Sequence, residues 1–119
     1  MARLLYVLPH STDDPRRAAT ALEAAVAAVE TGHEVALWLT DEGVRLAVKG
    51  VVDALLEAGP RPASDSLAAL EQRSATLYVS KPCFEGRGFA AEQLAAGGRL
   101  ADPAELAALV ADGWAPIPT

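Results

Sequence analysis

The chain has 119 residues, with a hydrophobic fraction of 51% and a charged fraction of 22%, which is typical of a single globular domain over residues 1–119. Ten basic and sixteen acidic residues give a net charge of −6, without the basic footprint of a nucleic-acid-binding protein. No apolar run reaches the ~18 residues of a membrane span and the N-terminus lacks a signal-peptide pattern, so we expect no membrane contact and a cytoplasmic location.

The first third of the chain predicts a strand, a helix and a second strand. Residues 4–8 form a continuous apolar run, as in a parallel strand with both faces buried. The Asp14-Pro15 pair predicts the N-cap and first position of a helix that runs to about Glu30 and is ended by Gly32. Residues 34–39 form the second strand, so this third of the chain is a βαβ unit.

Short elements are predicted in the middle of the chain. Residues 40–43 form a loop at the carboxyl end of the second strand. Residues 50–58 suit a short helix or an irregular segment, and residues 59–62 form a rigid turn because two of them are prolines. Either Ser64 or Asp65 then caps another helix.

The last third of the chain predicts a third buried strand at residues 75–79, followed by a loop at residues 80–88. A short helix is predicted at residues 89–95 and a short strand or extended link at residues 99–101. A second helix with an Asp-Pro start follows at residues 102–111. The last element is a strand at residues 114–117, which its prolines confine to an edge of the sheet.

Alternating strands and helices of this kind predict a three-layer α/β/α sandwich with a mainly parallel sheet of four or five strands. Ligands of such sheets bind at the carboxyl ends of the strands. Those ends carry the loops at residues 10–14, 40–43 and 80–88. We therefore expect any functional site to lie among these three loops, which would close a small pocket.

Cys83, in the third loop, is the strongest candidate for chemistry. It is the single cysteine, which excludes an internal disulfide and a zinc site with several thiolates. Backbone N–H groups of the loop, with Lys81 and Arg87 nearby, favour a thiolate, whereas Glu85 opposes one. Cys83 is equally compatible with a structural role as a small apolar side chain.

Other cysteine and nucleotide chemistries are tested by spacing. Ser80 occupies the position of the second thiol in a Cys-x-x-Cys pair, and Phe89 the position of the arginine in a cysteine phosphatase loop. His10 is the only well-placed base for a Cys-His hydrolase, and a metal site built on His10 and His33 has too few ligands. The first loop has no glycine for a phosphate, so we expect no metal and no cofactor.

Five short segments, spread over nearly the whole chain, follow one another in a recognisable order and spacing. They are Asp14-Pro15-Arg16-Arg17-Ala18, Thr31-Gly32-His33-Glu34-Val35, Asp41-Glu42-Gly43-Val44, Cys83-Phe84-Glu85-Gly86-Arg87-Gly88, and Leu94-Ala95-Ala96-Gly97 with Ala104-Glu105-Leu106. Together they resemble the DsrE/DsrF-like family of small sulfur-relay proteins.

The resemblance implies a single DsrE-like domain with a parallel, flavodoxin-like α/β fold and a ring-like homo-oligomer, a trimer or hexamer. It also implies a cysteine that carries sulfane sulfur as a persulfide, and Cys83 matches that cysteine. Many members have a second cysteine where this chain has Ser80. The resemblance therefore favours a carrier with one thiol, which would exchange sulfur with donor and acceptor proteins.

The leading hypothesis is a sulfur-transfer or sulfur-carrier protein that acts through a Cys83 persulfide. Lys81 and Arg87 would stabilise the anion, Gly88 would allow close backbone approach, and His10 would shuttle a proton if its loop lies beside the thiol. Two alternatives remain open: a non-enzymatic oligomeric binding or scaffold protein with a structural Cys83, and a small-molecule binding module at the strand ends. Whether the chain is an enzyme is left open.

Overall fold

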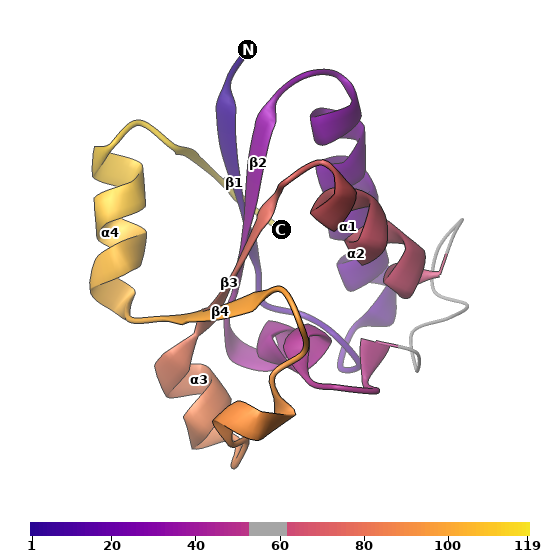
Figure 1. Cartoon of the computed structure of the whole chain (residues 1–119), viewed down its shortest axis with the longest axis vertical. Coiled ribbons are helices and arrows are strands. Elements are labelled where there is room, and N and C mark those ends of the chain that lie inside the picture. The colour runs from indigo at the N-terminus through magenta and orange to yellow at the C-terminus, as the bar shows by residue number, and fades with distance from the viewer. Residues whose placement is uncertain (53–61) are drawn as a thin grey trace.

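A five-stranded sheet forms the centre of the computed structural model, which describes residues 1–52 and 62–119 (Figure 1). Neighbouring strands all run parallel, in the order β4-β3-β2-β1-β5. The strands are β1 (Arg3–Leu8), β2 (Glu34–Leu39), β3 (Thr76–Ser80), β4 (Gly98–Ala101) and β5 (Ala115–Pro118). The predicted fold class is confirmed, and the segment near residue 100 is a strand rather than a link.

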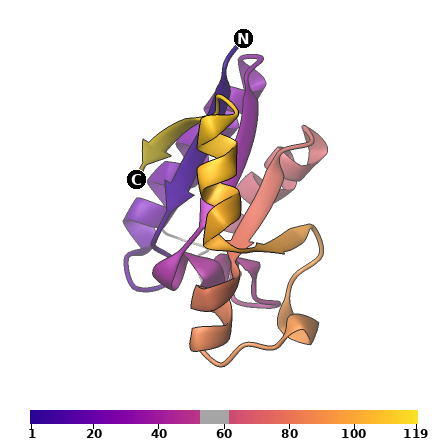
Figure 2. The ribbon, with the colours of Figure 1, turned by 90° about the vertical axis from the view of Figure 1, so that its left-hand side faces the viewer.

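Helices cover both faces of this sheet. α1 (Pro15–Glu30) and α2 (Ala63–Gln72) pack on one face, and α4 (Pro103–Ala111) crosses the opposite face (Figure 1, Figure 2). The larger core lies between the sheet and α1 and α2, while a smaller cluster under α4 is built on Leu5, Ala36 and Trp38. The two faces are therefore unequally covered.

The long helix α1 begins and ends as its sequence predicts. The Asp14 carboxylate accepts a hydrogen bond from the Arg17 backbone N–H at 3.2 Å, and Pro15 occupies the first helical position. Beyond the helix, Gly32 adopts a φ of +95°, the left-handed conformation that glycine tolerates best. Local chemistry thus determines both ends of α1.

Helix α2 begins earlier than expected, so the predicted cap at Ser64 or Asp65 is wrong. Pro62 is the N-cap, and its carbonyl accepts from the backbone N–H groups of Asp65 and Ser66. This register buries Ala63 against the core and brings the buried Ser66 hydroxyl within 3.3 Å of the Glu23 carboxylate on α1. Packing against α1 therefore overrides the local capping preference.

Most of the loops expected at residues 40–43 and 80–88 are helical. The 3-10 helix η1 (Asp41–Ala47) begins one residue after β2, and α3 (Lys81–Gly86) follows β3 directly. Phe84 of α3 is fully buried, which draws this helix onto the core. Cys83 therefore lies in the first turn of a helix, not in an open loop.

The predicted helix at residues 89–95 is reduced to the 3-10 turn η3 (Ala91–Gln93). Its flanks are extended instead: Ala95 donates its N–H to the Ala47 carbonyl at 2.7 Å, and Val48 and Leu94 form an isolated antiparallel bridge. These long-range bonds hold the segment against the end of η1 and leave few residues for a helix.

The final strand β5 lies at the edge of the sheet beside β1, as its prolines require. The predicted element at residues 50–58 falls largely on residues 53–61, and so does most of the predicted turn at residues 59–62. These parts lie outside the described residues. Within residues 1–52 and 62–119, none of the helices has the length and apolar character needed to cross a bilayer.

Candidate functional site

The carboxyl ends of β1, β2 and β3 are neighbours in the sheet, and the segments that follow them meet there. The Thr40 hydroxyl oxygen, after β2, lies 3.6 Å from the Cys83 sulfur, although the two residues are 43 positions apart. The Ser11 hydroxyl, after β1, donates to the Glu42 carbonyl oxygen at 2.7 Å. The structure thus assembles three distant segments around one edge of the sheet.

The Cys83 thiol is partly buried among hydrogen-bond donors. Burial raises the pKa of the thiol, but hydrogen bonds from the hydroxyls of Ser80 and Thr40 and from the Asp41 backbone N–H outweigh it. The Asp41 carboxylate opposes them, and the net result is a pKa below the ordinary value of a cysteine. Such a thiol supplies more thiolate, the nucleophilic form, at neutral pH.

Ser80 and Asp41 reach the thiol for different structural reasons. Ser80 is the buried N-cap residue of α3, yet its side chain makes no capping hydrogen bond to that helix, and its hydroxyl instead lowers the pKa of the Cys83 thiol. Asp41 has a φ of +48°, a left-handed conformation that is uncommon outside glycine. The residue in this conformation, Asp41, is also the one whose backbone N–H donates to the Cys83 sulfur.

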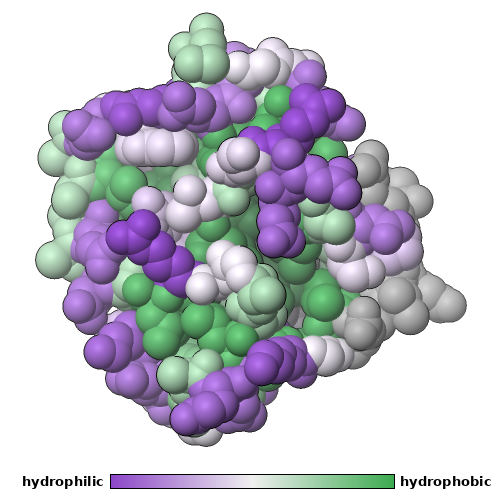
Figure 3. Space-filling model, in the orientation of Figure 1, coloured by the Kyte–Doolittle hydropathy of each residue, from purple (hydrophilic) through white to green (hydrophobic). Residues whose placement is uncertain are grey.

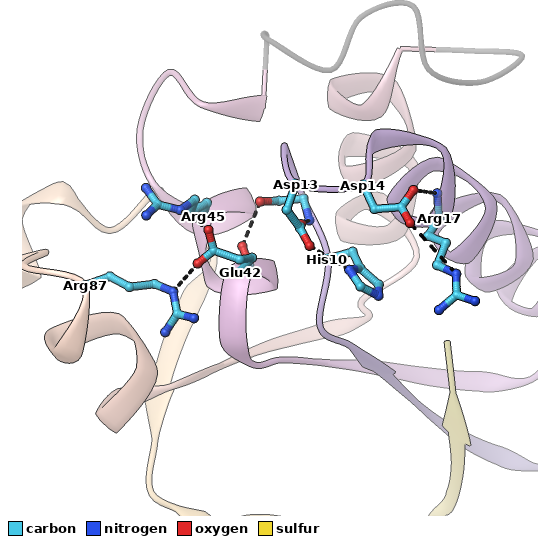
Figure 4. A network of polar contacts seen from close by, with 8 residues as sticks. His10, Asp13, Asp14, Arg17, Glu42, Arg45 and Arg87 are labelled. Atoms are coloured by element: carbon cyan, nitrogen blue, oxygen red, sulfur yellow. Dashed lines mark hydrogen bonds and ion pairs between the residues drawn. The ribbon is translucent and has the colours of Figure 1, made fainter.

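Glu42, the next residue of η1, links the same segments by charge (Figure 4). One carboxylate oxygen accepts from the Arg45 guanidinium at 3.1 Å, and the other accepts from the Arg87 Nε at the end of α3. The hydrogen bond from Arg87 is the largest cause of a Glu42 pKa below its ordinary value, and Arg45 adds to it against burial. The carboxylate therefore stays ionised at neutral pH.

The two cations expected to serve the sulfur occupy different places. Arg87 bonds Glu42 through Nε and the Cys83 carbonyl oxygen through Nη1, at 3.3 Å, so its nearest partners are not the sulfur. Lys81 is exposed at the start of α3, and its side chain makes no hydrogen bond to any other described residue. The Glu42 carboxylate is the main reason that the pKa of Arg87 is raised, and the charge of Cys83 adds to it, so the guanidinium also acts on the thiol at longer range. A direct effect of Lys81 on the sulfur stays a prediction.

His10 is held by its own loop. Its Nδ1 lies 2.8 Å from an Asp13 carboxylate oxygen, and the other Asp13 oxygen accepts from the Ser11 N–H at 2.8 Å. Burial raises the pKa of Asp13, but these bonds outweigh it and lower the pKa. Figure 4 shows His10 turned toward Asp13 on the far side of Glu42 from Arg87. Among the residues that the structure describes, His10 makes no hydrogen bond to Cys83.

Two glycines near the site differ in what they do. Gly88 has a φ of +82° and ends α3 by donating its N–H to the Glu85 carbonyl at 2.9 Å, but a Cβ placed there would meet open space. At Gly43, by contrast, a Cβ would lie 2.0 Å from the Leu8 carbonyl oxygen. The close backbone approach at this site therefore occurs at Gly43, between η1 and β1.

The sequence pattern pointed to Cys83 and Ser80 as site candidates but assigned no role to the side chains of Thr40, Asp41, Glu42 or Gly43. The signal was present, because these four residues directly follow a predicted buried strand. The sequence pattern does not indicate which of these residues contact α3, because those contacts depend on how η1 and α3 pack against each other.

Metal binding and cavities add little at this edge of the sheet. In residues 1–52 and 62–119 no cluster of three or more His, Cys, Asp or Glu side chains is arranged to hold a metal ion. A cavity of about 230 Å³ lies between α2, η1 and residues 95–97, and its lining does not include Cys83. The expected pocket closed by the three strand-end segments stays a prediction.

Comparisons with known proteins agree on the fold. The family model described as the DsrE/DsrF-like family matches residues 2–118. The crystal structure of the ychN protein from E. coli is 18% identical over the whole of both chains, with a TM-score of 0.84. A protein of unknown function, MTH1491 from Methanobacterium thermoautotrophicum, is 10% identical over both whole chains, with a TM-score of 0.70. Among curated proteins, none matches the chain.

Proposed function

The chain belongs to the DsrE/DsrF-like family, and from this premise we propose that it is a sulfur carrier that holds sulfane sulfur as a persulfide on Cys83. The observation that carries the proposal is the set of donors around the sulfur. Two hydroxyls and one backbone N–H serve a partly buried thiol at the carboxyl edge of a parallel sheet. A purely structural cysteine does not need such donors.

The proposed chemistry is two exchanges of one sulfur atom. The Cys83 thiolate attacks the outer sulfur of a donor persulfide, the Cys83 sulfur–sulfur bond forms, and the donor leaves as a thiolate. An acceptor thiolate then attacks the outer sulfur now held on Cys83 and restores the Cys83 thiolate. Each step exchanges one thiolate for another, so no oxidant or reductant is consumed.

The side chains around Cys83 suit one thiol working with external partners. Ser80 is a donor to the sulfur and cannot form a disulfide with it, so release of the sulfur requires an acceptor from outside the chain. Thr40 and the Asp41 N–H would stabilise negative charge as the thiolate leaves or returns. Lys81, exposed beside the site, would attract anionic persulfides.

We also place the carrier in the cytoplasm as a trimer or hexamer that exchanges sulfur with donor and acceptor proteins. Half-buried apolar residues of the β5 segment, Trp114 and Ile117, support an interface. Val44 and Val48 are buried in the chain's own core and do not contribute to this interface. Figure 3 shows a further apolar area low on this face of the molecule, around α3 and β4.

The carrier hypothesis is tested by incubating the wild type and Cys83→Ser with inorganic polysulfide and measuring intact mass. We expect the wild type to gain the mass of sulfur, to lose it to an added thiol, and Cys83→Ser to gain none. A wild type that gains no sulfur, or a Cys83→Ser variant that gains as much, would contradict the proposal. The same results would favour the alternative in which Cys83 is structural, which its packing against the core supports.

A further inference from the structure

Glu42 occupies the point where the three segments of the site are joined. Its carbonyl oxygen accepts from Ser11 after β1, while its carboxylate bonds Arg45 within η1 and Arg87 after α3. Ser11 is fully buried, so the first of these links is shielded from water. One residue therefore ties η1 to its neighbours on both sides.

The residues before Glu42 are the ones that serve the sulfur. Thr40 supplies a hydroxyl and Asp41 a backbone N–H, and together they form the turn where β2 leads into η1. Asp41 holds a left-handed φ of +48°, a conformation that persists only where neighbouring contacts maintain it. The contacts of Glu42, immediately after this strained residue, are positioned to do so.

The geometry points to Glu42 as a positioning residue of the Cys83 site, one whose ion pairs hold the Thr40–Asp41 turn so that its donors face the sulfur. This inference rests on the proposed sulfur-carrier function, because a sulfur carrier needs those donors to stabilise its thiolate. Arg87 takes part in the same arrangement, since it binds both the Glu42 carboxylate and the Cys83 carbonyl oxygen. The pair thus sets the distance between η1 and α3.

A positioning role and a simple charge effect predict opposite signs. Among the described residues, η1 carries the charged groups Asp41, Glu42 and Arg45, and α3 with its C-terminal end carries Lys81, Glu85 and Arg87. If Glu42 acted only as a nearby negative charge, removing it would lower the Cys83 pKa and would also free Arg87 to approach the sulfur. If Glu42 positions the turn, removing it withdraws donors and raises the Cys83 pKa.

The test measures the Cys83 pKa from the ultraviolet absorbance of the thiolate in the wild type, Glu42→Gln and Glu42→Asp. Glutamine presents an amide nitrogen to one of the two guanidinium groups, and aspartate keeps the charge but does not reach both. We expect both variants to contain about three- to tenfold less thiolate at pH 7, a pKa rise of roughly half a unit to one unit. Melting temperatures confirm that the variants are folded.

Glu85→Gln is the matched control, because it removes an exposed carboxylate two positions from Cys83 without touching the turn. We expect its thiol pKa to stay the same or to fall slightly. An unchanged or lower pKa in both Glu42 variants would overturn the positioning role. If Glu42→Gln does not fold, Glu42→Asp decides alone, since a charge effect predicts no change for it.

Sulfur loading of the wild type is measured separately by mass. A wild type that takes up no sulfur overturns the proposed function and leaves the pKa comparison intact. A wild type that takes up sulfur, with Glu42 variants whose pKa does not rise, overturns the positioning role alone.

Discussion

The hydrogen bonds that lower the pKa of Cys83 come from neutral donors, and the charge of Arg87 acts on the thiol only at longer range. Two hydroxyls and one backbone N–H donate to its sulfur. Arg87, four residues after Cys83, instead hydrogen-bonds the Glu42 carboxylate and the Cys83 carbonyl oxygen. Neutral donors stabilise a thiolate without binding it in an ion pair that the incoming sulfur would have to break. This arrangement suits a thiol that must repeatedly gain and lose a sulfur atom.

The pH dependence of Cys83 follows from this environment. The folded-state pKa is lowered, so alkylation of the native protein should reach half its maximal rate at a lower pH than alkylation of the urea-unfolded chain. By linkage, the thiolate stabilises the fold above the unfolded-state pKa, and this contribution is lost as pH falls through the folded-state pKa. Alkylation rates measured across pH, native and unfolded, check the prediction.

Thr40→Val tests the hydroxyl contribution, with Thr20→Val, an exposed position on α1, as its matched control. We expect the first substitution to raise the thiol pKa and the second to leave it unchanged. The thiol pKa is measured from the alkylation rate across pH. Equal thiol pKa values for Thr40→Val and the wild type would show that this hydroxyl does not stabilise the thiolate.

Gly43 determines how closely η1 approaches β1. A Cβ at this position would lie 2.0 Å from the Leu8 carbonyl oxygen, and neither atom can rotate away, because the backbone fixes the position of both. We expect Gly43→Ala to lower the free energy of unfolding by about 3 kcal/mol, near the upper end of overpacking effects. Urea denaturation measures the change.

Gly86→Ala is the control for Gly43→Ala. Gly86 is the last residue of α3, and a Cβ there meets nothing within 4 Å. We expect this variant to be as stable as the wild type, or more stable by roughly 0.4–1 kcal/mol because alanine restricts the unfolded chain. Equal losses in the two variants would show that the close approach at Gly43 is not what matters.

At the level of whole elements, two helices with the same Asp-Pro start differ in how they begin. Asp14 bonds the Arg17 N–H and caps α1, but Asp102, at the corresponding position of α4, makes no side-chain capping bond. The long α1 covers the main core, whereas α4 is shorter and lies on the thinner layer. Capping is thus strongest on the helix that the fold depends on most.

The capping difference gives a paired prediction. Asp14→Ala should cost about 1 kcal/mol of unfolding free energy, the usual loss for a capping side chain. Asp102→Ala should cost only a few tenths of a kcal/mol, because it removes a negative charge near the helix N-terminus but no hydrogen bond. Thermal denaturation of both variants measures the losses, and a larger loss for Asp102→Ala would contradict this account of the caps.

The molecule as a whole is asymmetric across its sheet. Two helices cover one face, and α4 lies on the other (Figure 2). On the α4 side, Leu106, Leu109 and Trp114 are only half-buried. The proline-containing β5 forms one edge of the sheet and the short β4 the other. Apolar side chains left partly exposed in this way favour burial against another copy of the chain.

Light scattering tests assembly directly. We expect a solution mass of three or six times the 12.3 kDa of one chain, with little change on dilution. Trp114→Arg places a charge in the half-buried apolar cluster and should reduce that mass, while Arg99→Lys, at an exposed position of β4, should not. A wild-type mass near 12.3 kDa at every concentration would contradict the proposed oligomer.

Much of this fold could be predicted from the chain alone because its signals are local. Continuous apolar runs marked the buried strands, the Asp14-Pro15 pair and Gly32 marked the ends of α1, and the position of Cys83 after the third strand marked the edge where the site lies. These features depend on neighbours within a few residues, which is the range over which backbone preferences act.

Packing between distant segments settled the rest. Ser64 and Asp65 are good caps, yet α2 begins before them, with Ala63 buried in the core and the Ser66 hydroxyl against Glu23 of α1. The partnership of Glu42 with Arg87 spans 45 positions, and the contact of Thr40 with Cys83 spans 43. Parallel strands made it foreseeable that these segments would meet. Which side chains touch depends on how η1 and α3 lie against each other, and that follows from buried residues such as Phe84 and Gly43, not from the local sequence around the thiol.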